Sequence, residues 1–155
     1  MKRFTRFINL ISRCGLQYRE VELQEIGLNA ANHMYIFCVC RQPGVSQEQL
    51  SKMLHINKSN VARSLKNLEE SGFIYKEINT NDKRNYCIYP TNKAKESLPF
   101  LVEKIEKWNQ FISRGLSENE IDTLYSLLKK VALNASEYNE KMKFQEGIDE
   151  DETNI

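Results

Sequence analysis

The sequence predicts a mainly helical chain organised around a winged helix-turn-helix with a small antiparallel β-hairpin wing. Two short helical patterns follow one another between Ser46 and Ser71. Two runs of strand-forming residues then flank a polar, charged segment from Asn79 to Asn85. Near both ends of the chain, apolar residues recur at helical spacing, which predicts long N- and C-terminal dimerisation helices.

The first helix of the motif is expected to begin at Gln47. Ser46 and Gln49 have the spacing of a capping box, in which the two residues satisfy each other's backbone N–H groups. The sequence then places Leu50, Met53 and Leu54 on one buried stripe. The segment from His55 to Asn57 breaks this pattern, and Asn57 suits the N-cap of the next helix.

The second helix is expected from Lys58 to Ser71, with Gly72 as its left-handed end residue. Val61, Leu65 and Leu68 are spaced to face the core. Its other face carries side chains that can bind base edges and phosphates. An isolated helix with such a face is usually only solvated, but the helix before it and the basic hairpin after it favour DNA binding. The polar face comprises Ser59, Asn60, Arg63, Lys66, Asn67 and Glu70.

The wing is predicted from strands at Phe73–Ile78 and Tyr86–Tyr89, ending at Pro90. Lys83 and Arg84 lie at the tip between the strands, with Asp82 close enough to orient the guanidinium. A charged tip alone is an ordinary soluble turn, whereas directly after such a helix it favours a wing. The candidate DNA-binding residues are therefore Ser46, Lys58, Ser59, Asn60, Arg63, Lys66, Asn67, Asp82, Lys83 and Arg84.

The charge distribution agrees with a DNA-binding region. The chain has 155 residues and a net charge of +1, but residues 1–98 hold 15 Lys or Arg against 9 Asp or Glu. Residues 99–155 hold 7 against 12. Positive charge therefore lies with the helix-turn-helix, where attraction to phosphates requires it.

Several sequence motifs carry a resemblance to a known family. They open both helices of the motif, close the second, form the wing tip and begin the next helix: Val45–Ser51, Asn57–Arg63, Leu68–Ile74, Asp82–Arg84 and Thr91–Lys95. From about Leu28 to Lys95 the chain resembles the DNA-binding core of the MarR family of bacterial transcriptional regulators. The resemblance implies that Ser59, Asn60 and Arg63 meet the major groove and Arg84 the minor groove. Two departures are Ala94, where the family usually has glycine, and Lys83, where a second arginine is common; lysine lacks the planar fork of arginine.

Three further helices are expected around this core, from about Lys2 to Leu23, from Thr91 onward, and after a capping box at Ser117 and Glu120. Pro99 either bends the middle one or marks a later start. The first has an apolar seam of Phe4, Phe7, Ile11, Cys14, Tyr18 and Val21. The second has Leu98, Leu101, Ile105, Trp108 and Ile112. The third has Ile121, Leu124, Leu128, Val131, Ala135, Tyr138 and Met142.

These seams either fold inward within one chain or join two chains. We favour a homodimer, because the three seams offer more apolar surface than one small subunit can cover, and the family resemblance implies the same. The predicted organisation is a helical dimerisation region at 1–28 and 99–145 and a DNA-binding region at 29–98. A disordered acidic tail is predicted at 146–155.

A ligand or redox role is less well defined by the sequence. The resemblance implies that a small, often aromatic effector binds a crevice near His33, Met34 and Phe37, although such residues more often belong to a core. Cys14 resembles a redox-sensing position of some relatives, but its place on an apolar stripe favours a small buried side chain without a redox role. Cys38 and Cys40 point apart on a helix, so no metal site and no cofactor are expected.

The sequence therefore predicts a dimeric regulator, expected to be a repressor. It would bind a pseudo-palindromic operator in double-stranded DNA and be released by a small ligand or an oxidant. The alternatives are a winged-helix protein-interaction module without DNA binding, or a regulator that senses redox state through Cys14. An enzyme is not expected, because no phosphate loop, serine elbow or HExxH motif is present. Without an apolar run of membrane-spanning length or a signal peptide, the expected location is the cytoplasm, with no membrane partner.

Overall fold

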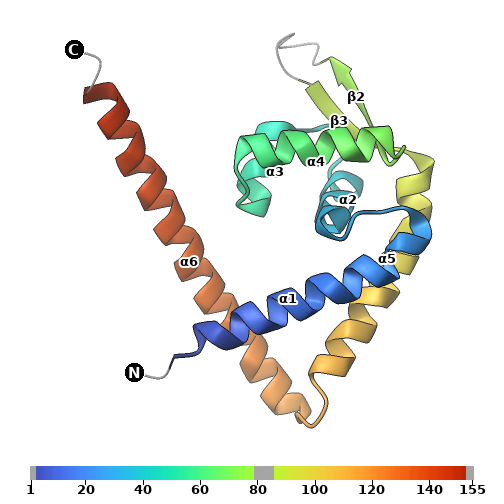
Figure 1. The fold of residues 1–155 in the computed structure, drawn as a ribbon, viewed down its shortest axis with the longest axis vertical. Helices are drawn as coiled ribbons and strands as arrows, with labels where there is room; N and C mark the ends of the chain where they lie inside the picture. The colour runs from blue at the N-terminus through green and yellow to red at the C-terminus, as the bar shows by residue number, and fades with distance from the viewer. Residues whose placement is uncertain (1–2, 79–85, 153–155) are drawn as a thin grey trace. The chain divides into compact units, whose positions relative to one another are not determined.

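The structure is a computed structural model that describes the backbone of residues 3–78 and 86–152 and the side chains of 3–78 and 86–139. The chain forms two compact units, residues 1–112 and 113–155 (Figure 1). The first unit contains α1 (Thr5–Glu22), the 3₁₀ turns η1 (Gln24–Ile26) and η2 (Ala30–Asn32), α2 (His33–Arg41), β1 (Val45–Ser46), α3 (Gln47–Leu54), α4 (Lys58–Glu70), β2 (Ile74–Ile78), β3 (Tyr86–Pro90) and α5 (Asn92–Ile112). The second contains α6 (Glu118–Glu152).

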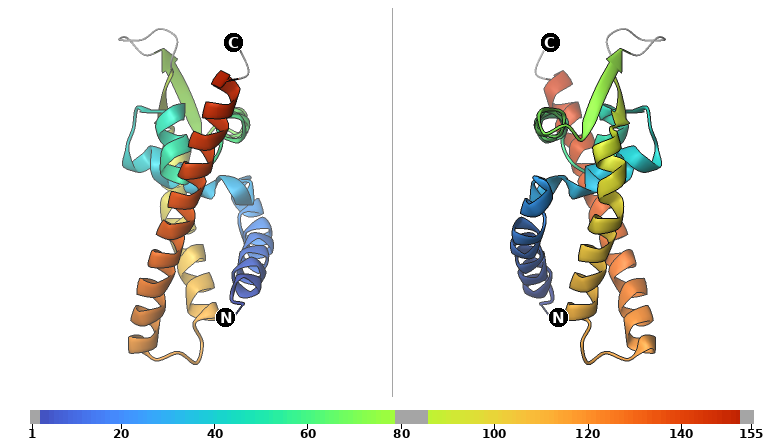
Figure 2. Two further views of the ribbon diagram at one scale, coloured as in Figure 1. Left: turned by 90° about the vertical axis from the view of Figure 1, so that its left-hand side faces the viewer. Right: turned by 90° about the vertical axis from the view of Figure 1, so that its right-hand side faces the viewer.

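The predicted winged helix-turn-helix is confirmed. Helices α3 and α4 are followed by an antiparallel hairpin of β2 and β3, in which Lys76 pairs with Ile88. Figure 2 shows β2 extending past α4, which is seen nearly end-on. A further strand, β1, was not predicted; its Val45 pairs with Ile88 and completes a sheet of order β1-β3-β2.

The core lies between α2, α4, the sheet and the start of α5. As predicted, Val61, Leu65 and Leu68 of α4 are buried, and Leu50 of α3 joins the same cluster. The prediction for Met53 is wrong, because its side chain is 43% exposed. Helix α3 is only 8 residues long and packs one narrow stripe against its neighbours, so the position three residues after Leu50 turns toward solvent.

Helices α1 and α5 pack through a small aromatic and polar contact. The rings of Tyr18 and Trp108 stack with their centroids 5.2 Å apart. The Tyr18 hydroxyl donates to the carbonyl of Lys104 at 3.0 Å, and the Lys104 ammonium lies 2.5 Å from the Glu22 carboxylate. Gly15 is the buried residue of α1, and a Cβ there would stand 3.4 Å from the Trp108 ring. Glycine therefore allows the close approach of the two helices.

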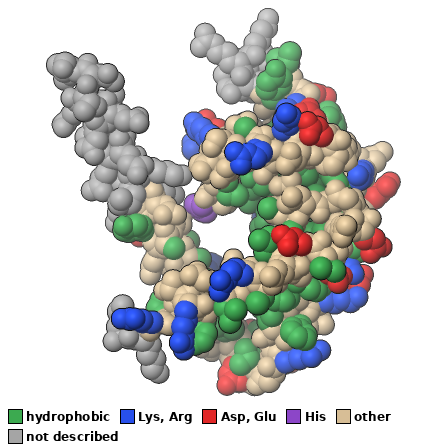
Figure 3. All heavy atoms as spheres, in the orientation of Figure 1, with side chains coloured by type: hydrophobic (Ala, Val, Ile, Leu, Met, Phe, Trp, Pro, Cys, Tyr) green, Lys and Arg blue, Asp and Glu red, His purple; other side chains and the backbone are tan. Residues whose placement is uncertain are grey.

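Most of the predicted seam of α1 is not buried within the chain. Phe4, Phe7 and Ile11 each leave about half of their surface exposed, Val21 more than that, and Cys14 is exposed as well. Figure 3 shows hydrophobic side chains gathered over α1 and α5 on the visible face. The reading of Cys14 as a buried apolar side chain is therefore wrong for the single chain.

Helix α5 starts one residue later than expected, at Asn92, and contains Pro99 within its length. Leu101 is fully buried, whereas Ile112 at the end of the helix is 44% exposed. Proline removes one backbone donor, and the helix nevertheless continues on both sides of it. Of the two alternatives for Pro99, the later start is excluded.

Helix α6 forms the second unit. One half of its predicted capping box is shown, because the Glu120 carboxylate accepts from the backbone N–H and from the hydroxyl of Ser117, each at 2.8 Å. The backbone of α6 is helical to Glu152. The disorder expected of the acidic tail at 146–155 stays a prediction. No helix in the described part of the chain combines the length and apolar character needed to cross a membrane.

Candidate nucleic-acid interface

The starts of α3 and α4 are fixed by local hydrogen bonds that the sequence predicted. The Ser46 hydroxyl accepts from the backbone N–H of Gln49, and the Gln49 side chain accepts from that of Ser46 at 2.8 Å. Asn57 accepts from the backbone N–H of Asn60 at 2.9 Å and so caps α4. His55 closes α3 with a φ of 53°, a left-handed conformation in which histidine is enriched.

The outward face of α4 carries the polar side chains chosen from the sequence. Arg63, Lys66 and Asn67 are exposed, as are the residues of its first turn. Lys66 and Glu70 form an ion pair of 3.8 Å with both side chains mostly in solvent, which holds Lys66 only weakly. Arg63 has no ion-pair partner among residues 3–78 and 86–139. The face is therefore free to meet a ligand with base-edge or phosphate acceptors.

The other predicted site residues lie in different situations. Ser46 is half-buried and its hydroxyl serves as the cap of α3. The Ser59 hydroxyl donates to the Asn57 side chain at 3.0 Å, so it supports the cap of α4. Asp82, Lys83 and Arg84 lie outside the described residues, and their role at the wing tip stays a prediction.

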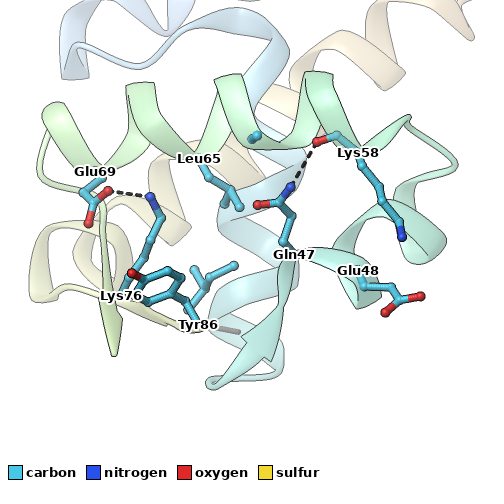
Figure 4. A pocket seen from close by; sticks show the side chains of 9 residues that line it. Gln47, Glu48, Lys58, Leu65, Glu69, Lys76 and Tyr86 are labelled. Atoms are coloured by element: carbon cyan, nitrogen blue, oxygen red, sulfur yellow. Dashed lines mark hydrogen bonds and ion pairs between the residues drawn. The ribbon is translucent and has the colours of Figure 1, made fainter. Parts of the chain in front are cut away.

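A cavity of about 670 Å³ opens between α4 and the hairpin. Figure 4 shows the side chains that line it, with Leu65 and Tyr86 directed toward its interior. The Gln47 amide donates to the carbonyl of Lys58 at 3.1 Å and joins the starts of α3 and α4 at one end. The lining residues are Gln47, Glu48, Lys58, Ala62, Leu65, Glu69, Lys76, Tyr86 and Ile88.

An ion pair closes the other end of this cavity. The Lys76 ammonium lies 2.5 Å from the Glu69 carboxylate, with side-chain exposures of 25% and 43%. Neither residue was among the site residues predicted from the sequence. One sequence signal could have identified Lys76 as a site residue: it is a charged residue at a strand position between Ile74 and Ile78. The cavity therefore lies between α4 and the hairpin, beside the exposed face of α4.

The residues assigned to a ligand crevice do not share one environment. His33 is buried with Nδ1 2.8 Å from the carbonyl of Ala30, Phe37 is half-buried, and Met34 is 45% exposed. Burial lowers the pKa of His33, the hydrogen bond to Ala30 opposes that effect, and the charge of Arg19 adds to it. None of the three lines the cavity beside α4.

The cysteines of α2 are poorly disposed for chemistry. Burial raises the pKa of the Cys38 and Cys40 thiols, and the charges of Arg41 and Lys95 only partly oppose it. Both thiols are therefore protonated near neutral pH and weak as nucleophiles or metal ligands. No cluster of three metal-binding side chains occurs among the residues whose side chains are described.

Comparison with known proteins places these features in a family. The model of the MarR family matches residues 28–86. The HTH-type transcriptional regulator YybA of Bacillus subtilis (strain 168) is 28% identical over 134 residues, which cover 86% of this chain and 89% of that protein.

Two solved structures are similar over nearly the whole chain. The transcriptional regulator SlyA has 33% sequence identity and a TM-score of 0.87, over 91% of this chain and 99% of that one. A MarR family transcriptional regulator from Listeria monocytogenes, complexed with 26mer DNA, has 32% identity and a TM-score of 0.86. That likeness covers 92% of this chain and 95% of the Listeria chain.

Proposed function

The chain belongs to the MarR family of transcriptional regulators, and from that premise we propose that it is a dimeric repressor that binds a pseudo-palindromic operator. In this proposal Ser59, Asn60 and Arg63 of each α4 meet base edges in the major groove. A dimer that covers a promoter blocks polymerase by occupancy alone, which makes repression the simplest mode of action.

The exposed face of α4 is the observation that carries the DNA-binding proposal. Arg63 and Lys66 project from a helix whose opposite side is fully buried, so the helix is presented on a rigid core. Lys58 and Lys76 line the cavity between α4 and the hairpin, where a phosphate backbone would run. The related Listeria regulator, which is complexed with 26mer DNA, supports DNA binding by this chain.

The exposed apolar faces of two helices support the dimer. Phe4, Phe7 and Ile11 of α1 are each about half exposed. On α6, considered by itself, a second row is exposed: Ile121, Leu124, Leu128 and Tyr138. Soluble monomers rarely leave such rows in water, and a second copy of the chain would cover them.

Release by an effector is the least constrained part of the proposal. Arg19 lies close enough to His33 to influence its pKa, and the buried Nε of Arg19 has no hydrogen-bond partner among the residues whose side chains are described. A small carboxylate or phenolate would supply that partner. Exposed Cys14 supports an oxidant as the alternative signal. Two measurements distinguish these signals. A thermal shift on addition of benzoate would support a ligand. DNA release by peroxide that is lost in a Cys14→Ser variant would support an oxidant.

The decisive experiment is a footprint of the protein on its own upstream DNA at two salt concentrations. We expect two protected patches about one helical turn (~34 Å) apart and an affinity that falls steeply as salt rises. The control is a Lys107→Met variant, which loses one exposed positive charge far from α4 in the sequence and should give the same footprint. Binding that is absent, or insensitive to salt, would contradict the proposal and revive the protein-interaction module.

A further inference from the structure

The end of α4 is held by the beginning of α5. Helix α4 closes with a Schellman motif, in which the backbone N–H of Phe73 donates to Leu68 at 2.9 Å and that of Gly72 donates to Glu69 at 3.0 Å. Gly72 has a φ of 76°. This motif satisfies the last carbonyls inside α4 but leaves those of Ser71, Gly72 and Phe73 pointing out of the helix.

Thr91, which directly precedes α5, and Lys93 in its first turn bind all three of these carbonyls. The Thr91 hydroxyl donates to Gly72 at 2.7 Å, and the Thr91 backbone N–H donates to Phe73 at 3.0 Å. The Lys93 ammonium donates to Ser71 at 2.8 Å and lies 4.2 Å from the centroid of the Phe73 ring. We call these contacts of Thr91 and Lys93 the α4–α5 clamp.

The clamp adds direct polar contacts between two helices that also share the hydrophobic core and are connected by the hairpin. Thr91 also accepts from the backbone N–H of Ala94 at 3.3 Å, so the same hydroxyl caps α5. Phe73 is fully buried, which anchors the gripped turn in the core. The positive charge of Lys93 at the carboxyl end of α4 is favourable for the helix dipole. A rotation of the first turns of α5 is therefore passed directly to α4.

We propose that Thr91 and Lys93 are positioning residues that set the distance and angle between the two copies of α4 on an operator. This inference rests on the proposed function, because it assumes that two chains present their α4 helices to one duplex. A two-site binder gains from its second site only when the geometry of the sites matches the DNA. The clamp would supply that fixed geometry without touching DNA.

The test compares duplexes that differ only in spacing. One carries the two half-sites found by footprinting, one has 2 base pairs inserted between them, and one carries a single half-site. The insertion moves the half-sites by about 7 Å and about 70° relative to one another. The wild type is expected to bind the inserted duplex about 100-fold more weakly than the native one.

The clamp variant is Thr91→Val with Lys93→Met, which removes the hydroxyl and the ammonium but keeps side-chain size. For this variant we expect the spacing penalty to fall below about 10-fold, with affinity for the single half-site close to that of the wild type. Thr91→Ser keeps the hydroxyl and should restore the wild-type penalty. Lys93→Met alone should give an intermediate penalty if the double variant does not fold. Lys107→Met, which breaks only an exposed ion pair on the same helix, is the matched control.

The outcomes separate the two proposals. If the wild type itself shows no preference for the native spacing, the dimeric mode of DNA binding fails, and the clamp proposal with it. If the wild type discriminates and the clamp variants discriminate equally, while their unfolding temperature falls, the clamp is only structural and the inference is overturned. Loss of single half-site binding in every clamp variant would likewise overturn it, because the clamp would then hold α4 itself in place rather than its spacing.

Discussion

Lys76 and Glu69 tie strand β2 to the recognition helix α4 through an ion pair of 2.5 Å at the edge of the cavity. The pair neutralises the charge of Lys76 at this edge. In the proposed mode of DNA binding, Glu69 would compete with phosphates for Lys76. Among the described residues, the lining of the cavity holds two lysines, Lys58 and Lys76, and two glutamates, Glu48 and Glu69, so its formal net charge is zero.

Replacing Glu69 with Gln should strengthen DNA binding. The amide keeps the shape of the side chain and frees Lys76 to neutralise one more phosphate, so the slope of log K against log salt should steepen by about 0.9. Fluorescence anisotropy across a salt series measures this. Glu96→Gln removes one exposed negative charge from α5 and is the control. Equal slopes for the two variants would show that Lys76 does not contact DNA.

Replacing Arg63 with Ala should relax base preference. An arginine that forks onto a guanine contributes about 1–3 kcal/mol of discrimination against the wrong base. Lys83→Ala, by contrast, should weaken binding to all sequences about equally, because a phosphate contact carries no sequence information. Competition binding with single-base operator variants distinguishes the two. Unchanged preference in the Arg63 variant would mean that another face of α4 reads the bases.

Gly15→Leu should separate α1 from α5. A Cβ at this position already lies 3.1 Å from the Arg19 Nη1 atom and 3.4 Å from Trp108, so a larger side chain cannot be accommodated without movement. We expect a loss of about 1–3 kcal/mol in the free energy of unfolding. Gly15→Ala should stay within about 1 kcal/mol of the wild type, because better helix propensity offsets the tight contact with the flexible arginine. Urea unfolding at one protein concentration is the measurement. If Gly15→Leu and Gly15→Ala lost equal free energy of unfolding, α1 and α5 would lie farther apart at this position than the structure shows.

Acidification should destabilise the fold through His33. Burial lowers the pKa of this imidazole in the folded chain, so its stabilising contribution is present above the unfolded pKa of about 6.5 and is lost as pH falls below it. Between pH 7.5 and pH 5.5 the wild type should lose more stability than a His33→Gln variant, by at most about 1.4 kcal/mol per pH unit. Urea unfolding at several pH values checks this. Parallel pH dependences for the two proteins would contradict it.

The local parts of the fold were predictable from the sequence. Ser46, Asn57 and Gly72 end or begin helices through hydrogen bonds within a few residues, so their spacing alone indicates the structure. The buried stripe of α4 follows from the helical period in the same way. Most of the exposed DNA-binding candidates are the opposite side of that stripe, and they needed no tertiary information.

The parts that depend on distant segments were not predictable. Strand β1 has only two residues and exists because Val45 meets Ile88 across the sheet. The pairing of Glu69 with Lys76 requires the register of the hairpin against α4, which no local pattern encodes. Met53 was assigned to the core by period alone, although the neighbours that would cover it are absent from its side of α3 among the described residues. The apolar pattern of α1 was predicted correctly. The pattern alone could not show that a single chain leaves most of these side chains exposed.

Because of this exposed face of α1, the stability of the folded protein is expected to depend on its concentration. Water in contact with Phe4, Phe7 and Ile11 is released whenever a second apolar surface docks there, so association adds to the stability of the folded form. A dilute solution is then the harshest condition for this protein. If the proposed dimer forms, each newly made chain is most vulnerable to proteases before it meets another, and a rising protein concentration protects the population as a whole.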